Sequence, residues 1–104
     1  MISELEELIL LAVAAMQPDS YSYTIRKELK ETGKRDLSLA TVHTALYRLE
    51  SKGLVKSSMG GQTDKRGGRS KRLYEITVTG REAITDVQSV RQAFWMRLQP
   101  GLQG

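Results

Sequence analysis

The sequence has no cysteine, and this excludes disulfide bonds, cysteine-ligated zinc and thiol chemistry. It has a single histidine, so no second imidazole can complete a metal site, and we expect neither a metal ion nor another cofactor. No apolar run approaches the roughly 20 residues that a membrane-spanning helix requires. Glu4, Glu6 and Glu7 precede the first apolar run, and their charge is wrong for a secretory signal. We therefore expect a soluble, cytoplasmic protein.

Residues for enzyme catalysis are also scarce. At 104 residues the chain is long enough for one compact core but too short for a deep catalytic cleft. Serines and threonines are common, but the one histidine, His43, falls on a helix predicted to be exposed rather than in an enclosed pocket. No set of nucleophile, base and oxyanion donors can be assembled, and we expect that the protein is not an enzyme.

Basic residues are concentrated in the middle of the chain. Residues 26–81 hold 14 basic and 6 acidic side chains, a net charge of +8, whereas the rest holds 2 basic and 6 acidic ones, a net charge of −4. This asymmetry indicates a polyanionic partner for the centre of the chain. It argues against a membrane-surface peptide, whose charge would follow one face of a single amphipathic helix. Solvated surface charge without a partner is the alternative.

The stretch from Ser38 to Gly53 predicts an exposed helix. Ser38 is a favourable N-cap, and Gly53 is a favourable residue just beyond the C-terminus. At about 100° per residue, one side is apolar and consists of Val42, Ala45, Leu46 and Leu49. The other side is small and polar at its start, then aromatic and basic: Ala40, Thr41, His43, Thr44, Tyr47, Arg48 and Ser51. Such a face suits a DNA major groove, although an ordinary amphipathic surface helix would have the same pattern.

Two helices are predicted before this stretch. Residues 4–16 are apolar around most of the circumference, so this helix should contact both its own core and a second chain. Residues 21–25 lead into a second helix that ends near Gly33. This second helix would be the scaffold helix of a helix-turn-helix.

A β-hairpin with a long tip is predicted after the exposed helix. Its strands would be residues 54–59 and 71–76, on either side of a segment with four glycines. Lys65, Arg66 and Arg69 lie among these glycines. Main-chain N–H groups and cations of such a loop can approach phosphates closely. A flexible loop that is basic by chance is the alternative.

A final helix is predicted from Thr79, which stands at capping-box spacing from Glu82, to Pro100. Its predicted coiled-coil seam has spacings of 3, 4, 3 and 4, with one polar position at Arg91, and consists of Ile84, Val87, Arg91, Phe94 and Leu98. We interpret the seam as a helix–helix dimer contact, with docking on the chain's own core as the alternative. The predicted domains are residues 1–78, for DNA binding, and residues 79–104, for dimerisation.

These segments together resemble the PadR family of bacterial transcriptional regulators, to about Ile84. The resemblance rests on ELEELILLAV, YSYTIRKEL, LSLATVHTALYRLESKGLV and RGGRSKRLYEITVTGREAI. It implies a mainly α fold with a small β-hairpin, namely a winged helix-turn-helix with a long C-terminal dimerisation helix. Two positions depart from the family pattern: His43 stands where tyrosine is usual, and Leu73-Tyr74 where paired tyrosines are frequent.

The resemblance also implies a homodimeric repressor that binds a palindromic operator in double-stranded DNA and responds to a small molecule. Its recognition-helix contacts would be Ser38, Ala40, Thr41, His43, Thr44, Tyr47 and Arg48, and its wing contacts Lys65, Arg66, Gly68, Arg69 and Lys71. Leu5 and Ile9 would join the C-terminal seam in the dimer. A planar apolar effector would stack on Phe94 and Trp95, unless Trp95 only packs within the dimer.

Two other functions are compatible with the sequence. A winged-helix module that binds proteins would retain its partners at high salt and would not shift DNA at low salt. A dimer dedicated to a small molecule would show quenching of Trp95 fluorescence by planar ligands without any effect on DNA.

Overall fold

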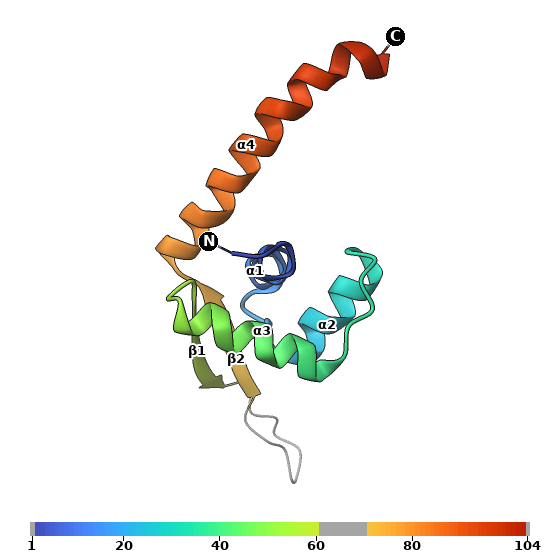
Figure 1. Ribbon diagram of the computed structural model, residues 1–104. Coiled ribbons are helices and arrows are strands. Elements are labelled where there is room, and N and C mark those ends of the chain that lie inside the picture. Colours follow the sequence, from blue (N-terminus) through green and yellow to red (C-terminus); the bar gives the residue numbers. More distant parts are fainter. Residues whose placement is uncertain (1, 61–70, 104) are drawn as a thin grey trace.

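The computed structural model describes residues 2–60 and 71–103, which form four helices and a two-stranded antiparallel sheet. The elements in chain order are α1 (Glu4–Met16), α2 (Ser22–Glu31), α3 (Leu39–Ser51), β1 (Val55–Gly60), β2 (Lys71–Ile76) and α4 (Val78–Gln103). In Figure 1 the first five elements are grouped together, and we call them the head; α4 extends away from it. The predicted fold class, a mainly α winged helix-turn-helix with a long C-terminal helix, is confirmed.

One apolar core holds the head together. Its fully buried apolar side chains come from α1, α2, α3 and β1: Ile9, Leu10, Val13, Ile25, Val42, Leu46, Leu49 and Val55. Burial of an apolar side chain of this size contributes about 1.5–3 kcal/mol relative to exposure. Tyr74 and Ile76 of β2 are buried in the same cluster, so the hairpin is fixed to the helices. The apolar face predicted for the exposed helix is therefore a core face.

Both ends of α3 form as the sequence predicts. Ser38 is the N-cap, and its Oγ accepts the N–H of Thr41 at 3.1 Å. Gly53 has a φ of 75°, in the left-handed region where a side chain is unfavourable. Its N–H donates to Glu50 O and that of Leu54 to Leu49 O, both at 2.9 Å, which is the Schellman closure of a helix. The chain therefore turns directly from α3 into β1.

The first turn of α1 is an ionic junction between four parts of the chain. Glu4 pairs with Arg35 in the α2–α3 connection. Glu6 pairs with Lys52 at the end of α3, at 2.9 Å, and Glu7 pairs with Arg91 of α4, at 2.7 Å. The Lys52 ammonium, together with the Ser3 N–H, holds the pKa of Glu6 below its usual value. These three glutamates, which in the sequence only argued against a secretory signal, thus join α1 to three other segments.

The start of α4 differs from the prediction. Thr77, not Thr79, is the cap: its Oγ1 accepts the N–H of Gly80 at 3.0 Å and donates to Gly53 O at 2.7 Å. Thr79 is exposed on the first turn. The N–H of Thr77 also donates to Leu54 O at 3.0 Å. These bonds to Gly53 and Leu54 fix the position of Thr77, and the helix therefore begins after it.

Close packing at this junction explains a glycine. A Cβ added to Gly80 would lie 2.1 Å from Leu54 O, a distance that no side chain can adopt. The spacing of Thr77 and Gly80 is therefore a requirement of how α4 leaves the head.

The predicted end of α4 at Pro100 is also wrong, since the helix continues to Gln103. A proline removes one backbone hydrogen bond, and in the final turn little of the helix depends on that bond.

Candidate nucleic-acid interface

The outer face of α3 divides into two groups of predicted DNA contacts. His43, Thr44 and Tyr47 lie on the side of the hairpin, and Tyr47 is 72% exposed. Ala40, Thr41 and Arg48 lie on the side of α1, in a hollow that also includes Ser3, Leu5 and Glu6, and Thr44 lines both hollows. The Thr41 hydroxyl lies 2.9 Å from Ser38 Oγ, so it takes part in the helix cap. Each group therefore faces a second element, the hairpin in one case and the start of α1 in the other.

The hairpin-side group forms one wall of a hollow of about 590 Å³ between α3 and the hairpin. The opposite wall consists of Arg72 and Tyr74 of β2, and Glu50 lies at the α3 end. Burial and the Glu50 carboxylate raise the pKa of the Tyr74 phenol, which the Arg72 charge partly offsets. The phenol therefore stays neutral at physiological pH, and the charges at this hollow are Arg72 and Glu50.

A second hollow, of about 340 Å³, adds the start of α2 to this arrangement. His43 lines it together with Tyr21, Ser22 and Lys71. The Lys71 ammonium lies 4.3 Å from the centre of the Tyr21 ring and 3.3 Å from its hydroxyl, to which it donates. The base of the wing is thus tied to the N-terminus of α2. The start of α2 and the base of the wing, which are far apart in the sequence, thus meet beside α3.

The remaining predicted wing contacts, Lys65, Arg66, Gly68 and Arg69, lie outside the described residues. Arg72 is a cation at this site that the sequence prediction missed. Strand alternation could have found it, because Arg72 shares a face of β2 with the buried Tyr74 and Ile76. That face is the one turned toward the helices.

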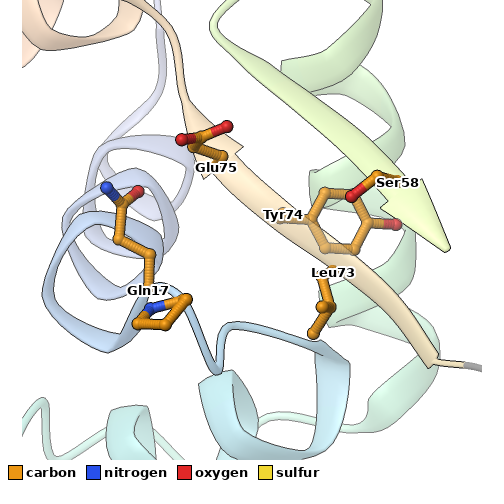
Figure 2. A pocket seen from close by; sticks show the side chains of 6 residues that line it. Gln17, Ser58, Leu73, Tyr74 and Glu75 are labelled. Atoms are coloured by element: carbon orange, nitrogen blue, oxygen red, sulfur yellow. The ribbon is translucent and has the colours of Figure 1, made fainter. Parts of the chain in front are cut away.

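The hairpin has another hollow, of about 320 Å³, toward the end of α1. In Figure 2, Gln17 faces β2, where Leu73, Tyr74 and Glu75 follow one another. Gln17 Oε1 accepts the N–H of Ile76 at 3.1 Å, so this side chain links α1 to the end of β2. The hollow holds none of the predicted DNA contacts.

The predicted dimer residues have very different environments. Ile9 is fully buried in the core of its own chain, and Leu5 is half-buried. On α4, Ile84 packs partly against the core, whereas Phe94 and Leu98 are exposed. The large apolar residue that α1 exposes is Leu11, whereas Leu10 and Ala12 on either side of it in the sequence are buried. Ile9 therefore cannot offer its side chain to a second chain, and Leu11 can.

An open apolar groove of about 800 Å³ lies between α1 and α4. Leu11, Ile84, Gln88 and Met96 are among its lining residues. Phe94 and Trp95, the predicted effector residues, do not line it and are exposed elsewhere on α4.

A membrane-spanning helix is not found among the described residues, since none of their helices combines the required length with enough apolar character.

Solved structures share this fold. A PadR-like transcriptional regulator of Bacillus cereus is 21% identical, with 96% of this chain and 92% of that chain covered and a TM-score of 0.75. A PadR family transcription regulator of Clostridium difficile is 27% identical, with 94% and 98% covered and a TM-score of 0.65. Bacillus subtilis PadR in complex with operator DNA is 19% identical, with 83% and 48% covered and a TM-score of 0.66.

No curated protein matches the sequence. The model of the transcriptional regulator PadR-like family matches residues 10–86, which is well over half of the chain. Together with an exposed recognition helix beside a basic hairpin, this match means that the chain belongs to the PadR-like family of transcriptional regulators.

Proposed function

We propose that the protein is a sequence-specific repressor that binds a palindromic operator as a homodimer. The observation that carries the proposal is the convergence of α3, the base of the wing and the start of α2 on two adjoining hollows. His43, Thr44 and Tyr47 would reach base edges, and the cations of the wing would neutralise phosphates. The complex of Bacillus subtilis PadR with operator DNA supports DNA as the partner.

Dimerisation is the second part of the proposal. The outer half of α4 exposes apolar side chains that its own head does not cover: Val90, Phe94, Trp95, Met96 and Leu98. Pairing of these surfaces in two copies would place two heads on one duplex, with half-sites about one helical turn, roughly 34 Å, apart. Residues 1–78 would then be the DNA-binding unit and residues 79–104 the dimerisation unit, acting in the cytoplasm.

Control by a small molecule is the third part. The apolar groove beside α1 has the size of a ligand site, and α4 forms one of its walls. A planar apolar effector there, or on Phe94 and Trp95, would alter the position of α4 and hence the spacing of the heads. Trp95 is half exposed, so its fluorescence would report binding.

Selection of bound fragments from genomic DNA, followed by a gel shift, tests the proposal. Wild-type protein should retain a defined palindromic fragment at a salt concentration that releases shuffled DNA. Thr44→Ala should change the sequence that is preferred more than the overall affinity, because Thr44 faces the hollow. Thr79→Ala, the same change at an exposed site on the first turn of α4, is the matched control and should leave the preference unchanged. Absence of any DNA shift at low salt would contradict the proposal and favour a protein-binding module.

A further inference from the structure

A chain of hydrogen bonds joins the last turn of α3 to the wing. Ser57 Oγ lies 2.6 Å from Glu50 Oε2, and Arg72 Nη1 donates to the same Ser57 Oγ at 2.9 Å. A serine hydroxyl has one hydrogen, and a guanidinium can only donate. The Ser57 hydrogen must therefore point to the Glu50 carboxylate, and a Ser57 lone pair must face Arg72. The direction of every bond in the chain is fixed.

The fold brings these three residues together from three elements. Glu50 is on α3 and half-buried, Ser57 is on β1 and half-buried, and Arg72 is on β2 and exposed. Ser57 is paired with Tyr74 in the sheet, which makes Arg72 its diagonal neighbour on the same face. That face is turned toward α3. The guanidinium is thus held at the mouth of the hollow that His43, Thr44 and Tyr47 line.

We propose that Arg72 binds the DNA backbone between the recognition helix and the wing, and that Ser57 and Glu50 are positioning residues that aim its guanidinium. This inference rests on the proposed DNA-binding function. If α3 lies in a major groove and the wing lies beside the adjacent minor groove, the backbone that separates the two grooves must pass between them. Arg72 lies there, and its fork of N–H groups matches phosphate oxygens.

The charges nearby support a phosphate as the ligand. Among the described residues, Arg72 makes no ion pair within 4 Å and is bonded only to Ser57. Ser57 separates the guanidinium from the Glu50 carboxylate, so the arginine is oriented without being neutralised by direct contact. One N–H is engaged, and the others of the five remain for an anion. An arginine that is already held by a hydrogen bond loses less side-chain conformational entropy when it binds a phosphate than an arginine without such a bond.

The charge of Arg72 and the orientation of its guanidinium can be removed separately. Arg72→Ala removes the charge, so the slope of log K against log salt should become shallower by about 0.9 on every DNA. Ser57→Ala keeps the charge of Arg72 but removes the hydrogen bond that orients its guanidinium. It should weaken binding to the selected operator by about 3- to 10-fold and leave the salt slope unchanged, because the cation is still present.

The measurement is fluorescence anisotropy of a labelled duplex, selected with the wild-type protein from random DNA, beside a shuffled duplex of the same composition. Ser57→Thr keeps the hydroxyl and should restore operator affinity. Arg72→Lys keeps the charge on an exposed side chain, so it folds whether or not the serine variants do; it should keep the slope and lose operator affinity. In the double variant with both alanines, the loss should equal that of Arg72→Ala alone.

A matched control is Arg81→Ala, which removes an exposed cation from the first turns of α4 rather than from the hollow. It should change neither operator affinity nor the difference between the two duplexes. An unchanged salt slope in Arg72→Ala would overturn the backbone contact. Full operator affinity in Ser57→Ala, or a further loss in the double variant beyond Arg72→Ala, would overturn the positioning role. Failure of the wild-type protein to bind either duplex would instead refute the proposed function itself.

Discussion

The head and the outer half of α4 use apolar residues in opposite ways. In the head, core side chains such as Ile9, Ile25 and Leu46 are fully buried within one chain. On α4, apolar side chains from Val90 to Leu98 are between 50% and 60% exposed. Apolar surface is normally removed from water, and a contiguous exposed stretch of it indicates an interaction site. The core of the head is thus completed within one chain, whereas the exposed apolar surface of α4 fits the dimer contact that we propose.

The largest expected effect is in the head. Leu46→Ala would leave a cavity in a fully buried site, and it should lower the free energy of unfolding by about 2–5 kcal/mol. Urea denaturation followed by circular dichroism measures this. Leu39→Ala, an exposed leucine at the start of the same helix, is the control and should cost much less. Equal losses in the two variants would show that the core is not where the structure puts it.

A change on α4 should affect association instead. Phe94→Ala should weaken the dimer by about 2 kcal/mol, since aromatic side chains contribute strongly to interfaces, and leave the unfolding of the head unchanged at concentrations where the wild type is monomeric. Sedimentation equilibrium measures the dissociation constant. Gln88→Ala, an exposed polar change on the same helix, serves as the control. A wild-type protein that is monomeric at high concentration would remove the basis of the comparison.

A smaller effect is expected at the junction of α1 with α3. Glu6→Gln should cost on the order of 1–2 kcal/mol, because the carboxylate is buried and accepts hydrogen bonds from Lys52 and from the Ser3 N–H. The pKa of Glu6 is lowered in the folded protein from 4.5. Its contribution is therefore complete at a pH above that unfolded value, and it is lost as the pH falls through the lower, folded pKa.

The free energy of unfolding, measured between about pH 2 and pH 7, tests this sign. That interval extends about two pH units to either side of the ordinary pKa of a glutamate. The glutamine variant should lose less stability on acidification than the wild type does. Glu75→Gln, at an exposed pair with Lys56, is the control and should follow the wild-type curve. A steeper acid loss in the Glu6 variant would contradict the assignment.

The smallest effect concerns the boundary between the two regions. Arg91 is at the polar position of the predicted seam, yet it pairs with Glu7 of its own α1. Arg91→Ala should change the free energy of unfolding by less than about 1 kcal/mol, because the guanidinium is 59% exposed. It should loosen the angle of α4 to the head, which distances between spin labels on Gln88 and Lys30 would report. An unchanged distance distribution would show that the pair of Arg91 with Glu7 does not fix the angle of α4 to the head.

The helices and their ends were predictable because they depend on neighbours three or four residues apart. Ser38, Gly53 and the apolar face of α3 follow from local spacing, and all are confirmed. The start of α4 was not predictable in this way. Thr79 has the local capping pattern, but Thr77 is the cap because two carbonyls from the end of α3 hold it. A contact between distant segments thus overrode a local signal.

Which apolar side chains face outward was also beyond the sequence pattern. The first helix is apolar around most of its circumference, so periodicity does not distinguish Ile9, which is buried, from Leu11, which is exposed. Packing against α2 and α3 makes that choice. The same holds for Arg72, whose importance depends on a strand register that pairs Ser57 with Tyr74.

The sequence by itself determined the order of the elements, the family and the basic character of the centre of the chain, because each follows from residue type and short-range spacing. The tertiary structure alone decided which strand cation faces the recognition helix, which glutamate of α1 binds which partner, and which apolar residues of α4 stay uncovered. Those features depend on the relative placement of segments up to 84 residues apart, as in the pair of Arg91 with Glu7. No local periodicity encodes a distance of that kind.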